Sequence, residues 1–179
     1  MRCFLAIEIP QNVKNQIFAM VKELKSLNTE NRIKWTSPDN MHLTMQFIGE
    51  VEYDRLEAVK QSLSNIKFAP FDIEFDFRPS YFPNKTNPNI IKLSIIKGDH
   101  ELKKINESIK AGLDKEGIEY EKKDFSPHLT LGRIKYLNGE FKEITISKIN
   151  GFTVRNFNLY CSDLTEEGPI HTKLAQFNL

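Results

Sequence analysis

The stretch from Asn40 to Glu50 reads NMHLTMQFIGE, and the stretch from Ser126 to Ile134 reads SPHLTLGRI. The chain has 179 residues and only four histidines. Two of these histidines, His42 and His128, open the same His-Leu-Thr phrase. This repeat of an uncommon residue in one short phrase decides how the rest of the sequence is interpreted.

Each phrase is predicted to form a strand with one polar and one apolar face, because residues i and i+2 of a strand share a face. His42 and Thr44 then point to one side, and His128 and Thr130 do the same in the second copy. The apolar residues between them anchor each strand from beneath. Each strand therefore presents an imidazole and a hydroxyl together.

The hydrophobic periodicity on either side of the phrases predicts an alternation of strands and helices. Two similar halves follow one another, each with one motif strand, which favours an α+β fold of two related lobes with mostly antiparallel sheets and outer helices. The predicted strands cover 2–9, 32–36, 42–48, 71–77, 90–97, 118–125, 128–134, 152–161 and 170–178, and the predicted helices cover 10–27, 53–66 and 100–115.

The composition is that of an ordinary globular protein, with 40% hydrophobic and 27% charged residues. No apolar stretch approaches the roughly 20 residues that cross a bilayer. Cys3 and Cys161 are too few for a disulfide framework or a cysteine-based zinc site, so a reducing cytoplasm is the expected compartment. The net charge of +1 argues neither for nor against nucleic acid as a partner of the whole protein, so any recognition of phosphate must be local.

Two imidazoles and two hydroxyls around one small volume suit a phosphodiester. One neutral histidine can take a proton from the attacking oxygen, and a protonated one can give a proton to the departing oxygen, because the pKa of histidine lies close to neutral pH. The hydroxyls of Thr44 and Thr130 can donate hydrogen bonds to the non-bridging oxygens. This scheme requires no metal and no cofactor.

Other interpretations of the repeat stay open at this point. A gene duplication without function would also repeat the phrase, and a single His-x-Thr on a strand is most often a half-exposed polar face. A zinc site is disfavoured, because the phrase offers no second ligand at i+2 and no HExxH or cysteine cluster completes a shell. A non-catalytic binding module is the alternative from another functional class.

At these two phrases the sequence resembles the two-histidine (2H) phosphoesterases, whose signature is a pair of His-x-Thr/Ser motifs. Among them it is similar to the RNA 2′,3′-cyclic phosphodiesterases, also called 2′-5′ RNA ligases. The resemblance covers nearly the whole chain and rests on the segments RCFLAIEIP, IKWTSPDNMHLTMQFIGEV, FSPHLTLGRI and FNLYCSDLTEEGPIHTKLAQFNL.

This resemblance implies one 2H phosphoesterase domain over residues 1–179, made of two interleaved lobes with a central groove. It implies hydrolysis of an RNA 2′,3′-cyclic phosphate to a 2′-phosphate, with reversible 2′-5′ ligation by the same groups. On the family's pattern His42 is the acid that protonates O3′ and His128 is the base that activates water. Thr44 and Thr130 correspond to the hydroxyls that hold the phosphate.

Three further residues are candidates for contact with the substrate. Arg133 matches a basic position associated with phosphate or RNA, but strict alternation places it opposite His128 unless the strand bulges near Gly132. Phe4 and, less strongly, Trp35 are candidates for stacking on a base. Both are also ordinary core residues.

Near the C-terminus, relatives often carry an aromatic residue after the Gly-Pro pair, whereas this chain has Ile170 and His171. An exposed strand position is the expected place for this third histidine. The expected partners are RNA with 2′,3′-cyclic phosphate ends, such as tRNA halves, or small cyclic nucleotides. No membrane is expected as a partner, and a monomer is the default.

Overall fold

The computed structural model describes residues 1–144, 148–166 and 168–179. Strands, α-helices and two short 3₁₀ turns alternate along this part of the chain. In chain order the elements are β1 (Arg2–Glu8), α1 (Gln11–Leu27), β2 (Arg32–Trp35), η1 (Pro38–Asn40), β3 (His42–Glu50), η2 (Tyr53–Arg55), α2 (Leu56–Ser64), β4 (Phe71–Phe82), β5 (Ile90–Lys97), α3 (Asp99–Lys115), β6 (His128–Tyr136), β7 (Phe152–Val154), β8 (Asn156–Thr165) and β9 (Gly168–Asn178).

The strands form two sheets in which every neighbouring pair is antiparallel. Sheet A has the order β3-β1-β8-β9, and sheet B has the order β2-β6-β5-β4-β7. One motif strand lies in each sheet, β3 in sheet A and β6 in sheet B. The predicted α+β class with two related antiparallel sheets is confirmed.

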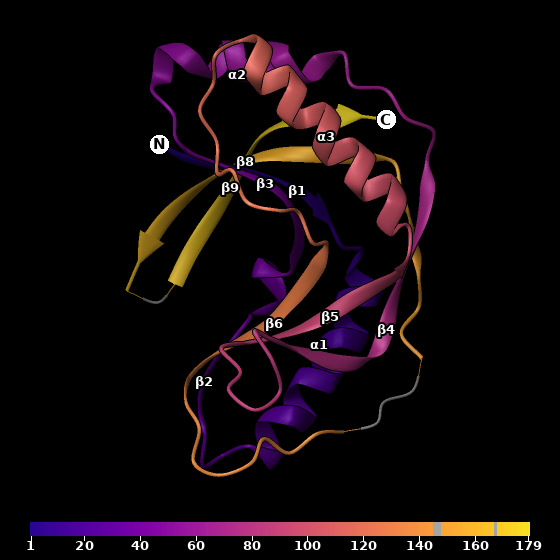
Figure 1. Cartoon of the computed structure of the whole chain (residues 1–179), viewed down its shortest axis with the longest axis vertical. Helices are drawn as coiled ribbons and strands as arrows, with labels where there is room; N and C mark the ends of the chain where they lie inside the picture. Colours follow the sequence, from indigo (N-terminus) through magenta and orange to yellow (C-terminus); the bar gives the residue numbers. More distant parts are fainter. Residues whose placement is uncertain (145–147, 167) are drawn as a thin grey trace.

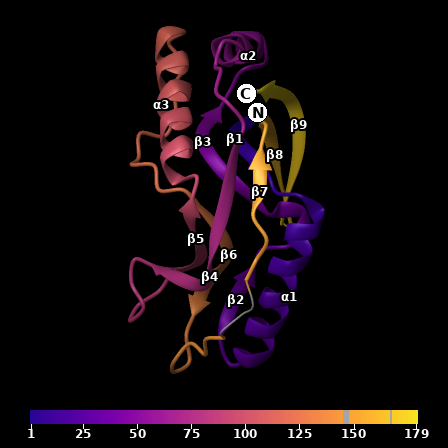
Figure 2. The same cartoon turned by 90° about the vertical axis from the view of Figure 1, so that its right-hand side faces the viewer.

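The helices lie on the outside of the sheets (Figure 1). Helices α2 and α3 contact strands of sheet A, whereas the end of α1 lies beside β2 of sheet B (Figure 2). Each helix places an apolar stripe inward at the 3.6-residue spacing that the sequence shows. In α1 this stripe consists of Val13, Ile17, Met20, Val21 and Leu24.

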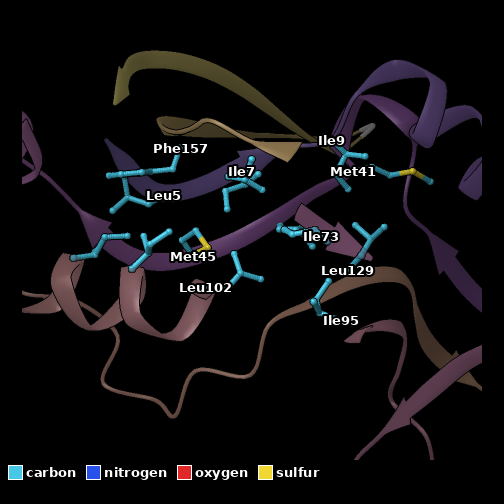
Figure 3. Close-up of a cluster of buried hydrophobic side chains, with 14 of the residues drawn as sticks. Leu5, Ile7, Ile9, Met41, Met45, Ile73, Ile95, Leu102, Leu129 and Phe157 are labelled. Atoms are coloured by element: carbon cyan, nitrogen blue, oxygen red, sulfur yellow. The ribbon is translucent and has the colours of Figure 1, made fainter. Parts of the chain in front are cut away.

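A single hydrophobic cluster draws side chains from both sheets and from all three α-helices. Figure 3 shows Leu5 and Met45 of sheet A near Leu102 of α3, with Ile73 and Leu129 of sheet B continuing the same cluster. The two sheets therefore share one core, and the faces of β3 and β6 that carry Leu43 and Leu129 are fixed against it.

The strand predicted at 118–125 is wrong, because this segment has no regular structure. The backbone N–H of Glu121 donates one hydrogen bond to the carbonyl of Phe47 at 2.9 Å. The carbonyl of Glu121 accepts a hydrogen bond from the side chain of Gln46 at 2.8 Å. The side-chain amide of Gln46 thus takes the place of a backbone group from a neighbouring strand, and the segment does not form a strand.

The single strand predicted at 152–161 is two strands. Residues Phe152–Val154 pair with β4 in sheet B, whereas the strand that starts at Asn156 pairs with β1 in sheet A. The chain changes sheets at Arg155. The alternation changes phase here, from Phe152 and Val154 to Phe157 and Leu159, with the polar pair Arg155 and Asn156 between the two runs. The pattern reports which face of each run is buried and not which sheet buries it.

Candidate active site

The two motif strands lie next to each other where the sheets meet. His42 is the first residue of β3, and His128 is the first residue of β6. In β3, His42 and Thr44 are half-buried, whereas Leu43 and Met45 are fully buried in the core. The residues of β6 follow the same pattern. Each strand therefore presents its imidazole and its hydroxyl on one face, as alternation predicts.

Both motif strands carry a bulge at the fourth residue of the phrase. In β3 the register passes from Thr44 to Gln46 between adjacent positions of β1, so Met45 has no opposite residue. In β6 it passes from Thr130 to Gly132 between adjacent positions of β5, so Leu131 has none. A bulge of this kind places two successive side chains on the same face and reverses the alternation beyond it.

The bulge in β6 brings Arg133 to the face of the catalytic candidates. Arg133 pairs with Ile90, and Ile90 shares its half-exposed face of β5 with Lys92, which pairs with Thr130. Arg133 therefore lies on the same side as His128. A bulge near Gly132 was the condition under which strand alternation allowed Arg133 to reach the face of His128, and the structure has this bulge.

The two bulges are held by different means. In β6 the bulge includes Gly132, where an added Cβ would lie 3.0 Å from Cε3 of Trp35 and 3.1 Å from Cγ2 of Ile33. In β3 the corresponding residue is Gln46, which is buried and accepts a hydrogen bond from the side chain of Asn106 at 3.1 Å. A missing side chain shapes one motif strand, and a buried amide network shapes the other.

His128 lies among basic groups. Its Nδ1 is 2.7 Å from the carbonyl of Ser126, so this nitrogen carries the proton in the neutral ring and Nε2 is left for chemistry. Burial lowers the pKa of His128, the hydrogen bond to Ser126 opposes that change, and the positive charges of Lys92 and Arg133 lower the pKa further. The imidazole is therefore neutral at neutral pH in the absence of an anion.

His42 lies among aromatic rings. Its ring centroid is 5.0 Å from that of Phe4 and 5.3 Å from that of His171, which meets it edge-on. Burial lowers the pKa of His42 to about 4, and the charges of His171 and Lys14 act in the same direction. A hydrogen bond to the backbone of Asn40 opposes them, two residues before the histidine as in the second motif.

The two residues proposed to stack on a base are both packed against other side chains. Phe4 is 3% exposed and lies under His42, Tyr160 and His171. Trp35 packs against the core beside Gly132, on the face of β6 opposite His128. The exposed aromatic residue on this side of sheet A is Phe47, which is 43% exposed and lies 6.0 Å from the ring of Phe4.

The structure brings His171 into the site, where the sequence favoured an exposed strand position. Its ring contacts both His42 and Phe4, with centroids 5.3 Å and 4.8 Å away. Its Nδ1 is buried and has no hydrogen-bond partner among the described residues. The departure from the aromatic residue usual after Gly168-Pro169 was the signal available in the sequence.

Asn158 is a site residue that sequence reasoning missed. Its side chain is 0% exposed, and neither its Oδ1 nor its Nδ2 has a partner within the described ranges. Asn158 and Thr44 both pair with Ala6, from opposite sides, so the two polar side chains share one face of sheet A. The ordinary alternation of Phe157, Asn158 and Leu159 gives no signal in the sequence that this amide is buried.

The described residues contain neither a cluster of metal ligands nor a membrane-spanning helix. No group of three or more histidine, cysteine, aspartate and glutamate side chains is arranged to hold a metal ion. None of the helices in this part of the chain has the length and apolarity needed to cross a membrane.

Residues 7–91 and 97–171 match the model of the LigT-like phosphoesterase family. The chain belongs to this family. It is 33% identical over 181 residues to an RNA 2′,3′-cyclic phosphodiesterase of Archaeoglobus fulgidus, covering 99% of each chain. It is 31% identical to the Thermotoga maritima protein of the same name, covering 98% of this chain and 94% of that one.

Solved LigT-like structures have the same fold. The protein TT0787 of Thermus thermophilus superposes with a TM-score of 0.81 at 26% identity, covering 100% of this chain and 98% of that one. E. coli LigT complexed with 3′-AMP superposes with a TM-score of 0.79 at 22% identity, covering 99% and 97%. The family resemblance read from the two motifs is confirmed, as is the class of enzyme to which full-length relatives belong.

Proposed function

We propose that this protein hydrolyses the 2′,3′-cyclic phosphate at the end of an RNA to a 2′-phosphate, with His42 and His128 as its acid–base pair. The observation that carries the proposal is the placement of two imidazoles at the start of two equivalent bulged strands. Each has a hydroxyl two residues further on the same face. The names of the full-length relatives support the same reaction.

The reaction is an in-line displacement at phosphorus. One neutral imidazole accepts a proton from water as the water oxygen attacks the phosphorus atom. The bond from phosphorus to O3′ breaks, and the other imidazole, in its protonated form, donates a proton to O3′. The product has a 3′-hydroxyl and a 2′-phosphate, and each proton transfer contributes on the order of 10²- to 10⁴-fold to the rate.

Thr44 and Thr130 are proposed to hold the phosphate from two sides. A hydroxyl can donate a hydrogen bond to a non-bridging oxygen, whose negative charge grows as the water oxygen bonds to phosphorus. Arg133 lies one strand bulge beyond Thr130 and adds a positive charge that is present at every working pH. Phe4 is proposed to support the site from beneath His42, since its ring has no open face for a base.

In the free protein both imidazoles are neutral, because burial and neighbouring cations lower both pKa values. An acid–base pair needs one of the two to be protonated. A bound phosphate supplies the missing interaction, because a negative charge within a few ångströms favours the protonated form of histidine. We therefore propose that substrate binding takes up a proton and thereby prepares the acid.

The family's pattern makes His42 the acid and His128 the base. The surroundings of the two residues act against this assignment, because the pKa of His42 is lowered to about 4 while His128 lies in a more open position. His42 can serve as the acid only if the phosphate raises its pKa substantially. On the family's pattern alone the pair is proposed with His42 as acid, and a substrate whose leaving group needs no proton can separate the two roles.

The same groups can also join two RNA ends, because a 5′-hydroxyl can replace water as the nucleophile while O3′ departs as before. A 5′-hydroxyl in place of water would attack the cyclic phosphate and give a 2′-5′ linkage. Water is far more concentrated than any RNA end, so hydrolysis is expected to dominate in dilute solution.

The test is incubation of the purified protein with a short RNA that ends in a 2′,3′-cyclic phosphate, with EDTA present. Hydrolysis adds the mass of one water, and resistance of the product to a 3′-phosphatase places the phosphate on O2′. His42→Ala and His128→Ala are each expected to lower kcat/KM by about 10²- to 10⁴-fold. His100→Ala is the matched control, because His100 is an exposed residue of α3.

Full turnover by either variant of the pair would overturn the proposed chemistry, and loss of activity in EDTA would show that a metal takes part. An RNA that binds without turnover would favour the alternative, a non-catalytic module for RNA ends.

A further inference from the structure

The face of sheet B that carries His128 and Thr130 continues into two rows of residues across neighbouring strands. In the first row Ser80 pairs with Lys92 and Lys92 pairs with Thr130. In the second row, beyond the bulge, Phe82 pairs with Ile90, Ile90 with Arg133, and Arg133 with Lys34. Residues that pair directly across antiparallel strands share a face, so both rows lie on the side of the site.

Neither row contains an acidic residue, and the two rows together contain three cations. Lys34, Lys92 and Arg133 form no ion pair with any residue that the structure describes. Lys34 and Arg133 are exposed, and Lys92 is half-buried. The surface defined by Lys34, Phe82, Lys92 and Arg133 is named the basic face.

The basic face also offers an aromatic ring to solvent. Phe82 is 55% exposed at the end of β4, and the Nζ atom of Lys92 lies 6.0 Å from its ring centroid. Exposed aromatic rings next to cations are the usual means by which proteins bind single-stranded nucleic acid without regard to sequence. The corresponding edge of sheet A differs, because its lysine, Lys173, is paired with Glu8 at 2.8 Å.

The basic face begins at the catalytic site itself. Lys92 and Arg133 lie close enough to His128 for their charges to lower its pKa. Thr130 and Arg133 are separated along β6 by on the order of 10 Å, given the rise of a strand. This is within reach of the phosphates that precede the reacting one in an RNA strand.

We propose that the basic face binds the RNA strand on the 5′ side of the cyclic phosphate, with Lys92, Arg133 and Lys34 on its backbone phosphates and Phe82 under a base. The inference rests on the proposed function and extends it by naming the surface that holds the strand, so that an RNA of several nucleotides is preferred to a free cyclic mononucleotide. A net charge of only +1 makes these cations a local feature and not part of a general basic surface.

The chemistry of the substrate supports this choice of occupant. A 2′,3′-cyclic phosphate can only be the 3′ end of its strand, so everything else that belongs to the substrate leaves the site in the 5′ direction. A polyanion that enters along sheet B meets three cations that the described residues leave unpaired, and each contact releases counterions from the strand. A cyclic mononucleotide has no atoms to place there.

The experiment compares kcat/KM for a ten-nucleotide RNA ending in a 2′,3′-cyclic phosphate with that for a nucleoside 2′,3′-cyclic phosphate, at several salt concentrations. Wild type is expected to prefer the RNA, with a KM that rises steeply with salt. Lys34→Gln and Phe82→Ala are each expected to reduce the preference for RNA by about fivefold or more. Lys34→Gln also lowers the slope of log KM against log salt by about 0.7.

Lys104→Gln is the matched control, because it removes the same charge from the exposed side of α3 and is expected to change neither substrate's kinetics nor the salt slope. Equal losses on both substrates, or an unchanged preference in Lys34→Gln and Phe82→Ala, would overturn the inference. That failure is distinct from failure of the proposed function, which would appear as mononucleotide turnover that survives His42→Ala or His128→Ala.

Discussion

The two halves of the site use the same phrase in different surroundings. His42 and His128 each open a strand, each is hydrogen-bonded to a backbone group two residues earlier, and each precedes a bulge at the same position. His42 is enclosed by Phe4 and His171, whereas His128 lies beside Lys92 and Arg133. The phrase itself sets the geometry of each half, and the neighbouring strands set its electrostatics.

We propose that this difference lets one repeated motif serve two opposite chemical roles once a phosphate is bound. Burial among aromatic rings and proximity to cations both favour the neutral form of an imidazole. His42 is the more deeply buried of the two rings, whereas the cations beside His128 belong to the basic face. The following predictions test this asymmetry, starting with the largest expected effect.

The strongest test of the two roles is a substrate in which sulfur replaces O3′. A thiolate leaves without needing a proton, so a variant that lacks the acid recovers its activity on this substrate and a variant that lacks the base does not. On the family's pattern His42→Ala is rescued, with its deficit of about 10²- to 10⁴-fold largely removed. Single-turnover rates measure the rescue. Rescue of His128→Ala instead would reverse the roles, in line with the lower pKa of His42.

The pH dependence of the reaction follows from the direction of the two shifts. Both pKa values lie below the ordinary histidine value of 6.5 in the free protein. Since kcat/KM reports the free enzyme, its bell-shaped profile is expected to peak below pH 6.5 and to fall by about tenfold per pH unit above the peak. The profile of kcat reports the bound complex, so its maximum is expected at higher pH, because the bound phosphate raises the pKa of the histidines. A kcat/KM maximum above pH 7 would contradict the lowered pKa values of His42 and His128 in the free protein.

The two bulges can be broken separately. Gly132→Ala would place a Cβ against the ring of Trp35, and Gln46→Ala would leave Asn106 and the carbonyl of Glu121 without the amide. Each is expected to lower the free energy of unfolding by about 1–3 kcal/mol, measured by urea denaturation. Gly132→Ala should raise KM for RNA through Arg133, whereas Gln46→Ala should act on the half of the site that holds His42. Identical kinetic effects would show that the bulges do not shape the two halves separately.

The smallest expected effect concerns the third histidine. His171→Phe keeps a ring against Phe4 and His42 but removes a charge that lowers the pKa of His42. The kcat/KM profile is therefore expected to move to higher pH by less than about one unit, because burial, the larger cause, remains. His100→Phe on α3 serves as the control. A shift of the kcat/KM profile to lower pH would contradict the effect of His171 on the pKa of His42.

The sequence predicted the elements that depend on local pattern and missed those that depend on distant partners. The alternation in both phrases correctly gave the faces of His42 and His128, and helical spacing gave α1, α2 and α3. The segment 118–125 was wrongly predicted as a strand. The side chain that hydrogen-bonds to it, that of Gln46, is far away in the chain, so local pattern gives no sign of this contact. The change of sheet at Arg155 is accompanied by a change of phase in the alternation, but the sheet that each run joins is set by distant strands.

The same distinction applies to the site. The condition under which Arg133 reaches the site, a bulge near Gly132, was read from strand geometry. The choice between bulge and regular strand depends on Trp35 and Ile33, which lie on another strand. The contacts of His171 and the buried amide of Asn158 depend on how β8 and β9 meet β1, and no pattern within those strands specifies that register.

The route of the chain has a consequence for how the enzyme moves. The backbone crosses from β1 of sheet A to β2 of sheet B, returns to β3, crosses again to β4–β7 and comes back at β8, and one hydrophobic cluster fills the space behind both motif strands. Drawing one imidazole away from the other would require breaking that cluster. We therefore expect the spacing of the pair to stay constant through a catalytic cycle, so that turnover proceeds by movements of protons and side chains around a stiff frame.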